Sequence, residues 1–187
     1  MLCWRIPCIA LALLAAQAGA AEAAEDLSVA VERRGSLFAV RARAIVAAPV
    51  TLVWQVLTDY ERLPQFIPGI SSSVVLLRSA DRVLVEQHGE ARFLVFSIPI
   101  EVRYEVQESP PYWIASRAVG GNLRRMSSRY DLNPNAARPG VQLDYTGEIE
   151  PDFELPPLVG PFALRSMVEE QFTAMVDEIE RRAAPAK

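Results

Sequence analysis

The sequence has 187 residues, with 19 basic and 23 acidic side chains, one histidine and a formal net charge of −4 at pH 7. A chain of this length forms one domain of ordinary size. The acidic balance argues against a nucleic-acid partner, because phosphate contacts need a basic surface.

The first twenty residues have the pattern of a secretory signal peptide. Arg5 supplies a positive charge, an apolar run extends from Ile9 to Ala16, and Ala18-Gly19-Ala20 presents the small residues that signal peptidase needs. The run is shorter than the roughly 20 residues that span a hydrocarbon core. We therefore expect cleavage after Ala20 and a periplasmic or secreted protein; an uncleaved anchor is the alternative.

Both cysteines, Cys3 and Cys8, lie inside this segment, so the mature chain is expected to have no disulfide and to be stable by packing alone. Residues 21–26 are predicted to be a flexible spacer. One folded domain is expected over residues 27–183, with no internal repeat.

Two strands and two helices are predicted first. From Leu27 a strand pattern extends to Val46 and is broken at Arg34-Gly35, which predicts a hairpin. Helical spacing follows over residues 50–59, and a short second helix over 60–66 precedes the Pro68-Gly69 loop. The apolar face of the first helix is predicted to hold Val50, Val53, Trp54 and Leu57.

The next eighty residues have β patterns almost throughout. Apolar and polar residues alternate most clearly from Phe96 to Val106, and again over 141–150. This period indicates one buried and one solvated face, which is typical of an antiparallel sheet. Further strands are predicted at 74–78, 82–92, 112–119 and 123–132, with a turn at Gly120-Gly121 between the last two.

The longest helical signal follows a proline-rich connection and covers residues 161–182. Its apolar side holds six residues, namely Leu164, Met167, Val168, Phe172, Met175 and Ile179. One long helix and one six- to seven-stranded antiparallel sheet, each with a single apolar face, must cover each other. We therefore predict an α+β helix-grip fold, in which the curved sheet wraps the helix and leaves a cavity.

The segment Asp59-Tyr60-Glu61-Arg62-Leu63-Pro64-Gln65-Phe66-Ile67-Pro68, after the helix that begins at Pro49, resembles the signature of the START-like (SRPBCC) superfamily. Its spacing of prolines and aromatic residues is closest to the polyketide cyclase / coenzyme Q-binding branch. The resemblance implies a helix-grip fold with a deep apolar cavity. The functions it implies range over lipid carriage, quinone binding and polyketide ring closure.

His88 is flanked by Glu86 and Glu90, which on a strand share its side of the sheet, and this is the arrangement that a base-plus-carboxylate site needs. However, Val83, Val85 and Ala91 have the opposite parity and form the expected buried set. We therefore predict that His88 is solvated and that the chain has no catalytic histidine. With one imidazole and no thiol in the mature chain, we expect no metal site and no cofactor.

The candidate ligand-binding residues lie on the predicted inner faces of the sheet and the long helix. The tyrosines among them suit a lipid or quinone pocket or an ordinary core, and the methionines suit a cavity or core filling. Residues beside the Pro68-Gly69 loop are predicted to gate the cavity, to touch a membrane transiently, or simply to pack. The set is Phe66, Ile70, Ile100, Val102, Tyr104, Tyr130, Tyr145, Met167, Gln171 and Met175.

Gln171 is the one polar residue at the centre of the helix's apolar stripe. A buried amide without a partner costs roughly 1–3 kcal/mol. We expect it to bond a sheet tyrosine or a water, or else to orient a ligand. The arginines of the sheet, Arg117, Arg124, Arg125 and Arg129, are expected to be offset by outward glutamates instead of forming a membrane-binding surface.

Two functions follow from these expectations. The first is an exported, monomeric binding or carrier protein for a hydrophobic small molecule such as a lipid, isoprenoid or quinone. The second is an aromatase/cyclase-type enzyme acting on a polyketide-like substrate, which needs a titratable group inside the cavity. The inward set contains no carboxylate or histidine, which favours binding; an accessory domain that recruits a membrane complex is a third hypothesis.

Overall fold

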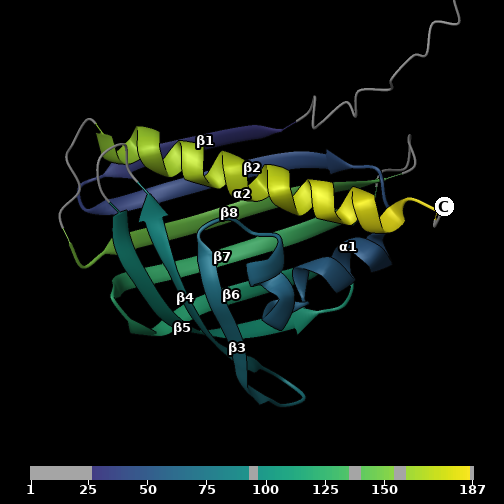
Figure 1. Ribbon diagram of the computed structural model, residues 1–187, viewed down its shortest axis with the longest axis horizontal. Coiled ribbons are helices and arrows are strands. Elements are labelled where there is room, and N and C mark those ends of the chain that lie inside the picture. The colour runs from purple at the N-terminus through teal and green to yellow at the C-terminus, as the bar shows by residue number, and fades with distance from the viewer. Residues whose placement is uncertain (1–26, 93–96, 135–139, 154–158, 186–187) are drawn as a thin grey trace, which may run out of the picture.

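The computed structural model describes residues 27–92, 97–134, 140–153 and 159–185. Eight antiparallel strands form one sheet, and a long helix crosses its inner face (Figure 1). In chain order the elements are β1 (Ser28–Arg34), β2 (Leu37–Val46), α1 (Val50–Leu57), the 3₁₀ helix η1 (Tyr60–Gln65), β3 (Ile70–Arg78), β4 (Val83–Arg92), β5 (Ser97–Ser109), β6 (Trp113–Gly121), β7 (Leu123–Pro134), β8 (Val141–Pro151) and α2 (Val159–Ala183).

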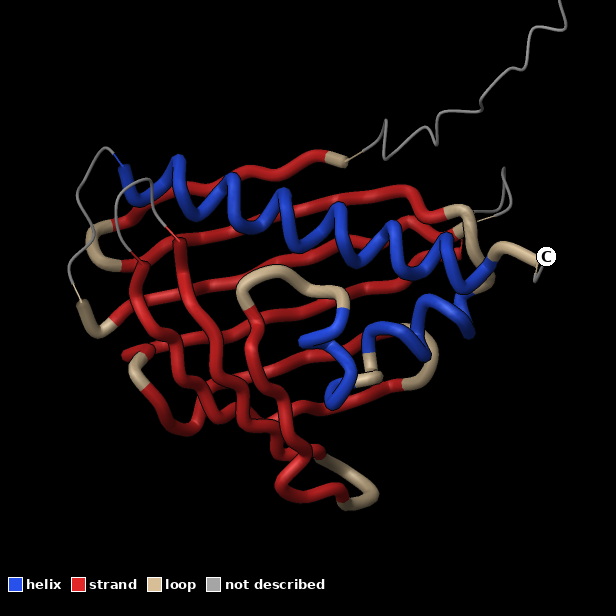
Figure 2. The backbone as a smooth tube through the Cα atoms, viewed as in Figure 1, coloured by secondary structure: helices blue, strands red, loops and turns tan. Residues whose placement is uncertain are grey.

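The strand order is β1-β2-β8-β7-β6-β5-β4-β3, so β2 pairs with the last strand. The strands β3, β4 and β5 run at a steep angle to β1, β2 and β8, which shows how strongly the sheet curves (Figure 2). This curvature lets one face wrap around α2. The predicted helix-grip fold is confirmed. The sheet has eight strands instead of the six to seven expected, because both arms of the predicted N-terminal hairpin, β1 and β2, belong to it.

The core lies between α2 and the concave face of the sheet. The inward side of α2 is buried at positions spaced by three and four residues, as a helix with one apolar face requires. These positions include Leu164, Val168, Phe172, Met175, Val176 and Ile179. Among the described helices, none combines the length and the apolar character that crossing a membrane requires.

The short helices differ in detail from the prediction. In α1 the fully buried residues are Val53, Val56 and Leu57, while Val50 and Trp54 are only half-buried, because one side of this short helix packs against α2. The predicted second helix is a 3₁₀ helix with Pro64 inside it.

The predicted turn at Gly120-Gly121 is wrong, because both glycines belong to β6. Gly121 has φ +111°, and a β-carbon there would collide with the Glu101 carbonyl group of β5. Only a residue without a side chain lets the two strands approach this closely. The first 26 residues and Phe96 lie outside the described residues.

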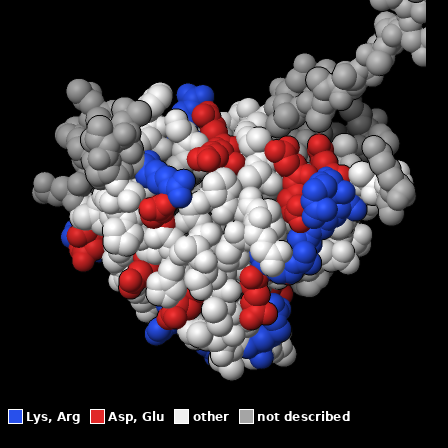
Figure 3. Space-filling view, viewed as in Figure 1, with Lys and Arg blue, Asp and Glu red and all other residues white. Residues whose placement is uncertain are grey.

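The outer face of the sheet carries paired charges, as predicted. Arg43 lies opposite Asp144 across β2 and β8, with Nε and Oδ1 2.6 Å apart. Arg41 lies 3.7 Å from Glu32 of β1. The arginines of the central strands are also paired, as in Arg117–Glu105 and Arg124–Asp152. Figure 3 shows the opposite side of the molecule, where α2 lies in front of the sheet, and there too basic and acidic side chains are interspersed without a large field of one sign.

Candidate functional site

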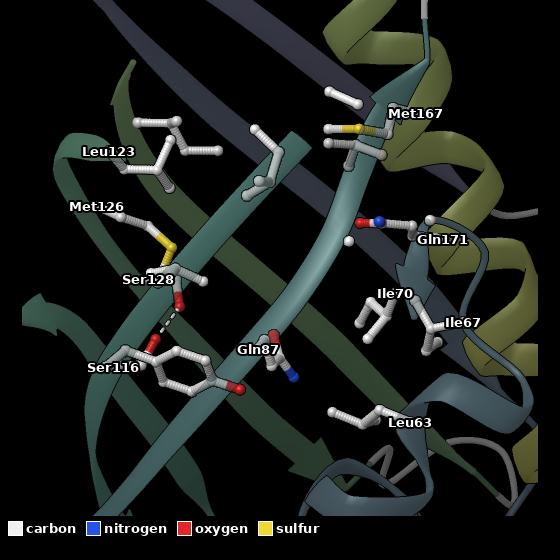
Figure 4. Close-up of a pocket in the computed structure, with 18 of the residues that line it drawn as sticks. Leu63, Ile67, Ile70, Gln87, Ser116, Leu123, Met126, Ser128, Met167 and Gln171 are labelled. Carbon is white, nitrogen blue, oxygen red and sulfur yellow. Dashed lines mark hydrogen bonds between the residues drawn. The ribbon is translucent and has the colours of Figure 1, made fainter. Parts of the chain in front are cut away.

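A pocket of about 320 Å³ lies between the concave face of the sheet and the inner face of α2. This volume is at the lower end of the range for small-molecule sites, about 300–1,000 Å³. Leu63 of η1, Ile67 of the following turn and Ile70 at the start of β3 approach it opposite Leu123 and Met126 of β7 (Figure 4). Most of its lining is apolar.

Nine of the ten predicted residues line this pocket, which places them together in space. They are Ile70, Ile100, Val102, Tyr104, Tyr130, Tyr145, Met167, Gln171 and Met175. Period-two and helical spacing placed eight of them on the inner faces, whereas Ile70 was predicted from its position beside the Pro68-Gly69 loop. Their contact with a ligand stays a prediction.

Phe66 is not among the lining residues. It follows the last residue of η1, and its ring lies beneath the guanidinium of Arg182, 5.5 Å from ring centroid to Cζ. Leu63 of η1 and Ile67, two residues after η1 ends, line the pocket instead. Phe66 thus packs against the C-terminal part of α2, which is one of the alternatives predicted for the residues beside the Pro68-Gly69 loop.

The sequence analysis missed polar residues on the pocket wall, namely Gln87, Ser116 and Ser128 (Figure 4). Gln87 has the same parity as the buried Val83 and Val85, so the alternation of its strand already carried this signal. Ser116 and Ser128 lie opposite each other on β6 and β7, and their hydroxyl oxygens are 2.6 Å apart.

Three aromatic rings pack together at one end of the pocket. The centroids of Tyr130 and Tyr145 are 4.8 Å apart, and Phe172 of α2 lies 6.0 Å and 5.5 Å from them. Burial raises the pKa of Tyr145 to about 12, although a hydrogen bond with Ser128 acts in the opposite direction. Burial also raises the pKa values of Tyr104 and Tyr130, so these hydroxyls stay protonated near neutral pH.

Gln171 connects α2 to the loop before β3. Its Nε2 donates a hydrogen bond of 3.1 Å to the Pro68 carbonyl oxygen, a backbone partner that was not among the expected tyrosine, water or ligand. The loop is also held to β4, where the Glu90 amide donates to the Gly69 carbonyl at 2.8 Å. Gly69 has φ +82°, and a β-carbon on Gly89 would collide with that carbonyl, so both glycines permit this approach.

Among the described residues that line the pocket, the charged side chains lie at the rim of the pocket. His88 is among the residues that line the pocket, but its side chain is solvated as predicted: it is 45% exposed, and its Nε2 lies 3.6 Å from Glu86. Glu90 and Arg92 form an ion pair beside the Gly69 loop, which lowers the pKa of Glu90. Among the described residues, no three His, Cys, Asp or Glu side chains are placed to hold a metal ion.

One carboxylate lies directly behind the pocket wall. Tyr60 lines the pocket, and its hydroxyl donates to Glu108 Oε1 at 2.7 Å. Arg78 lies 3.6 Å from the same carboxylate oxygen. Burial, and then the hydrogen bond to Glu108, raise the pKa of Tyr60.

A curved antiparallel sheet that holds a long C-terminal helix over an apolar pocket defines the START-like class of helix-grip proteins. Residues 46–176 match the family model described as polyketide cyclase / dehydrase and lipid transport, and the chain belongs to that family. Among curated proteins, a sequence search found no significant match.

Solved structures agree in fold. The Zhui aromatase/cyclase from Streptomyces sp. R1128 is 21% identical, with TM-score 0.65, and the alignment covers 79% of this chain and 96% of that one. The STAR-related lipid transfer protein from Xanthomonas axonopodis is 17% identical, with TM-score 0.64, and the alignment covers 82% of this chain and 98% of that one. Human STARD10 is 9% identical, with TM-score 0.62, and the alignment covers 83% of this chain and 73% of that one. At these identities the likeness establishes the fold alone.

Proposed function

We propose that the protein binds and carries a hydrophobic small molecule in the pocket between the sheet and α2. The observation that carries this proposal is the pocket itself: about 320 Å³ of space lined mostly by apolar side chains, with the charged Glu90 and Arg92 only at its rim. Each Å² of apolar ligand surface removed from water contributes about 25 cal/mol. Lipids, isoprenoids and quinones are the ligand classes that fit this description.

Ligand capture tests the proposal directly. The protein is purified from its native compartment without detergent, and its bound molecules are extracted and identified by mass spectrometry. We expect one class of apolar molecule at near-stoichiometric amount. A protein without extractable ligand that also fails to bind an apolar fluorophore such as 1-N-phenylnaphthylamine contradicts the proposal.

A cyclase-type enzyme is the alternative, and the contact between Tyr60 and Glu108 favours it. The Glu108 carboxylate accepts a hydrogen bond from the Tyr60 hydroxyl, which lines the pocket. Glu108 is therefore positioned to accept a proton from a substrate by way of the Tyr60 hydroxyl. A linear 1,3,5-triketone is a suitable probe. Its enol carbon forms a bond to a carbonyl carbon of the same chain, and water leaves. If the protein is an enzyme, the parent accelerates ring closure and the Glu108→Gln variant does not. If it is a carrier, neither the parent nor the variant accelerates ring closure.

We also propose that the chain is exported, with cleavage after Ala20. The support is the charged, apolar and small-residue order of residues 1–20. The intact mass of the protein recovered from the periplasm or medium tests this. A mature N-terminus at Ala21 is expected, and an uncleaved chain recovered from the membrane fraction contradicts it.

A further inference from the structure

Strand register places several hydroxyl groups side by side on one wall of the pocket. Ser116, Ser128 and Gly147 form one row across β6, β7 and β8. Gly147 has no side chain, and the ring of Tyr145 lies over it, so that its hydroxyl reaches the same row. The two serine hydroxyls are 2.6 Å apart.

Two further tyrosines add hydroxyls without protein partners. Among the described residues, no protein group forms a hydrogen bond with the hydroxyl of Tyr104 or of Tyr130. Neither hydroxyl is fully buried, because the only fully buried side-chain polar atom without a partner in the described residues is Arg182 Nη2. These two hydroxyls therefore remain accessible from the pocket. Tyr104 as a whole is only 8% exposed, so its hydroxyl is directed into the pocket and away from bulk solvent.

The charge of this wall restricts what it can bind. Burial keeps the tyrosines protonated, so each can donate a hydrogen bond but none carries a charge. Along the described lining, the cation Arg92 lies at the rim with its side chain 75% exposed. A carboxylate or phosphate group at the hydroxyl wall would lose its hydration without gaining a counter-ion, which is costly.

We infer that the hydroxyls of Tyr104, Ser116, Ser128, Tyr130 and Tyr145 form a subsite for the carbonyl oxygen of an uncharged ligand. The apolar remainder of that ligand lies against Met126, Leu123 and Met167, which face the space beyond the two serines (Figure 4). This inference rests on the proposed binding function and adds the polar group by which the ligand is oriented.

Three probes with one ring skeleton test the inference: tetralin, 1-tetralone and 1,2,3,4-tetrahydro-1-naphthoate at pH 7.5. Their dissociation constants are measured by displacement of 1-N-phenylnaphthylamine. The parent protein is expected to bind 1-tetralone at least as tightly as tetralin, and the carboxylate at least about tenfold more weakly than 1-tetralone.

Two variants remove the hydroxyls with little change of shape: Tyr104→Phe with Tyr130→Phe, and Ser116→Ala with Ser128→Ala. Each is expected to weaken 1-tetralone binding about five- to tenfold and to leave tetralin within about twofold. Tyr112→Phe is the matched control, because Tyr112 is exposed and does not line the pocket. It should change neither constant.

The outcomes separate this inference from the function it rests on. If the parent binds none of the probes, both are overturned. If it binds tetralin and 1-tetralone but the ratio of their constants is the same in the parent and in both variants, the carrier function stands and the subsite is overturned. Tighter binding of the carboxylate than of the ketone also overturns the subsite.

Discussion

The ring of Tyr145 lies directly over Gly147, two residues further along β8. A β-carbon on residue 147 would come within 2.6 Å of the Tyr145 hydroxyl oxygen. The ring has little room to move away, because it packs against Tyr130 and Phe172 with centroid separations of 4.8 and 5.5 Å. The missing side chain of Gly147 therefore determines where the Tyr145 hydroxyl lies in the pocket.

Gly147→Ala is expected to destabilise the protein by about 1–3 kcal/mol, the usual cost of overpacking a filled space. It should also weaken 1-tetralone binding, because the Tyr145 hydroxyl is displaced from Ser128. Urea unfolding and probe displacement measure the two effects. Gly120→Ala is the control: its new methyl group would meet Arg103 Cβ at an ordinary 3.9 Å. Equal stability of the two variants would show that the Tyr145 ring moves freely.

Met167→Trp tests whether the space beside α2 is a cavity or a packed core. Met167 is half-buried and lines the pocket, so the larger ring is expected to occupy empty space. Binding of 1-N-phenylnaphthylamine should be lost, while the free energy of unfolding changes by less than about 0.5 kcal/mol. Thermal melts and a probe titration measure both.

The control for this change is Ser166→Trp, on the solvent-facing side of the same helix, which should bind the probe normally. In a packed core, Met167→Trp would instead cost about 1–3 kcal/mol. Such a loss, together with a parent that binds no probe, would contradict the carrier function.

His88→Ala is expected to leave ligand binding within about twofold and stability within about 0.5 kcal/mol, because the side chain is half exposed and lies beside Glu86. Gln87→Ala is the informative neighbour. Gln87 lines the pocket and donates to Ser73 Oγ at 3.1 Å, and Ser73 is buried. We expect it to cost about 1 kcal/mol. If His88→Ala abolishes ligand binding or a catalytic activity while Gln87→Ala does not, the hypothesis of a histidine-dependent enzyme is supported.

Glu178 should make stability depend on pH. Hydrogen bonds from Arg181 and then Arg182 lower its pKa from 4.5 to about 2. Since the pKa is lower in the folded protein, the stabilisation is fully present above about pH 4.5 and is lost as pH falls towards 2. Glu178→Gln should cost about 2 kcal/mol at pH 7 and close to nothing near pH 2.

Urea unfolding at several pH values measures this difference. The control is Glu169→Gln, which removes an exposed i,i+4 ion pair with Arg165 and should cost less than about 0.5 kcal/mol at any pH. Glu178, Arg181 and Arg182 form one charged cluster at the end of α2, and Arg182 also donates a 3.0 Å hydrogen bond to Asp59. If the two variants lose equal stability at pH 7, this cluster does not anchor α2.

Local periodicity explains why most of the pocket could be predicted. A strand exposes alternate residues to opposite faces, so the parity of Val102 and Tyr104 on β5 and of Tyr145 on β8 already placed them inward. The same holds for Met167 and Met175, which lie eight residues apart on α2. Gln87 could have been included by the same parity. Phe66 could not be placed in this way, because the turn after η1 follows neither period.

Residue order along the chain was thus sufficient for the fold class, the antiparallel sheet, the long C-terminal helix and the inner face of each element. These properties depend on repeats of two and 3.6 residues, which are local. Tertiary structure alone decided that Ser116 meets Ser128, that the Tyr145 ring packs against Phe172 of α2 and that Gln171 bonds Pro68, 103 residues away. Each of these contacts depends on strand register or helix placement, and both are set by the packing of the whole core instead of by neighbouring residues.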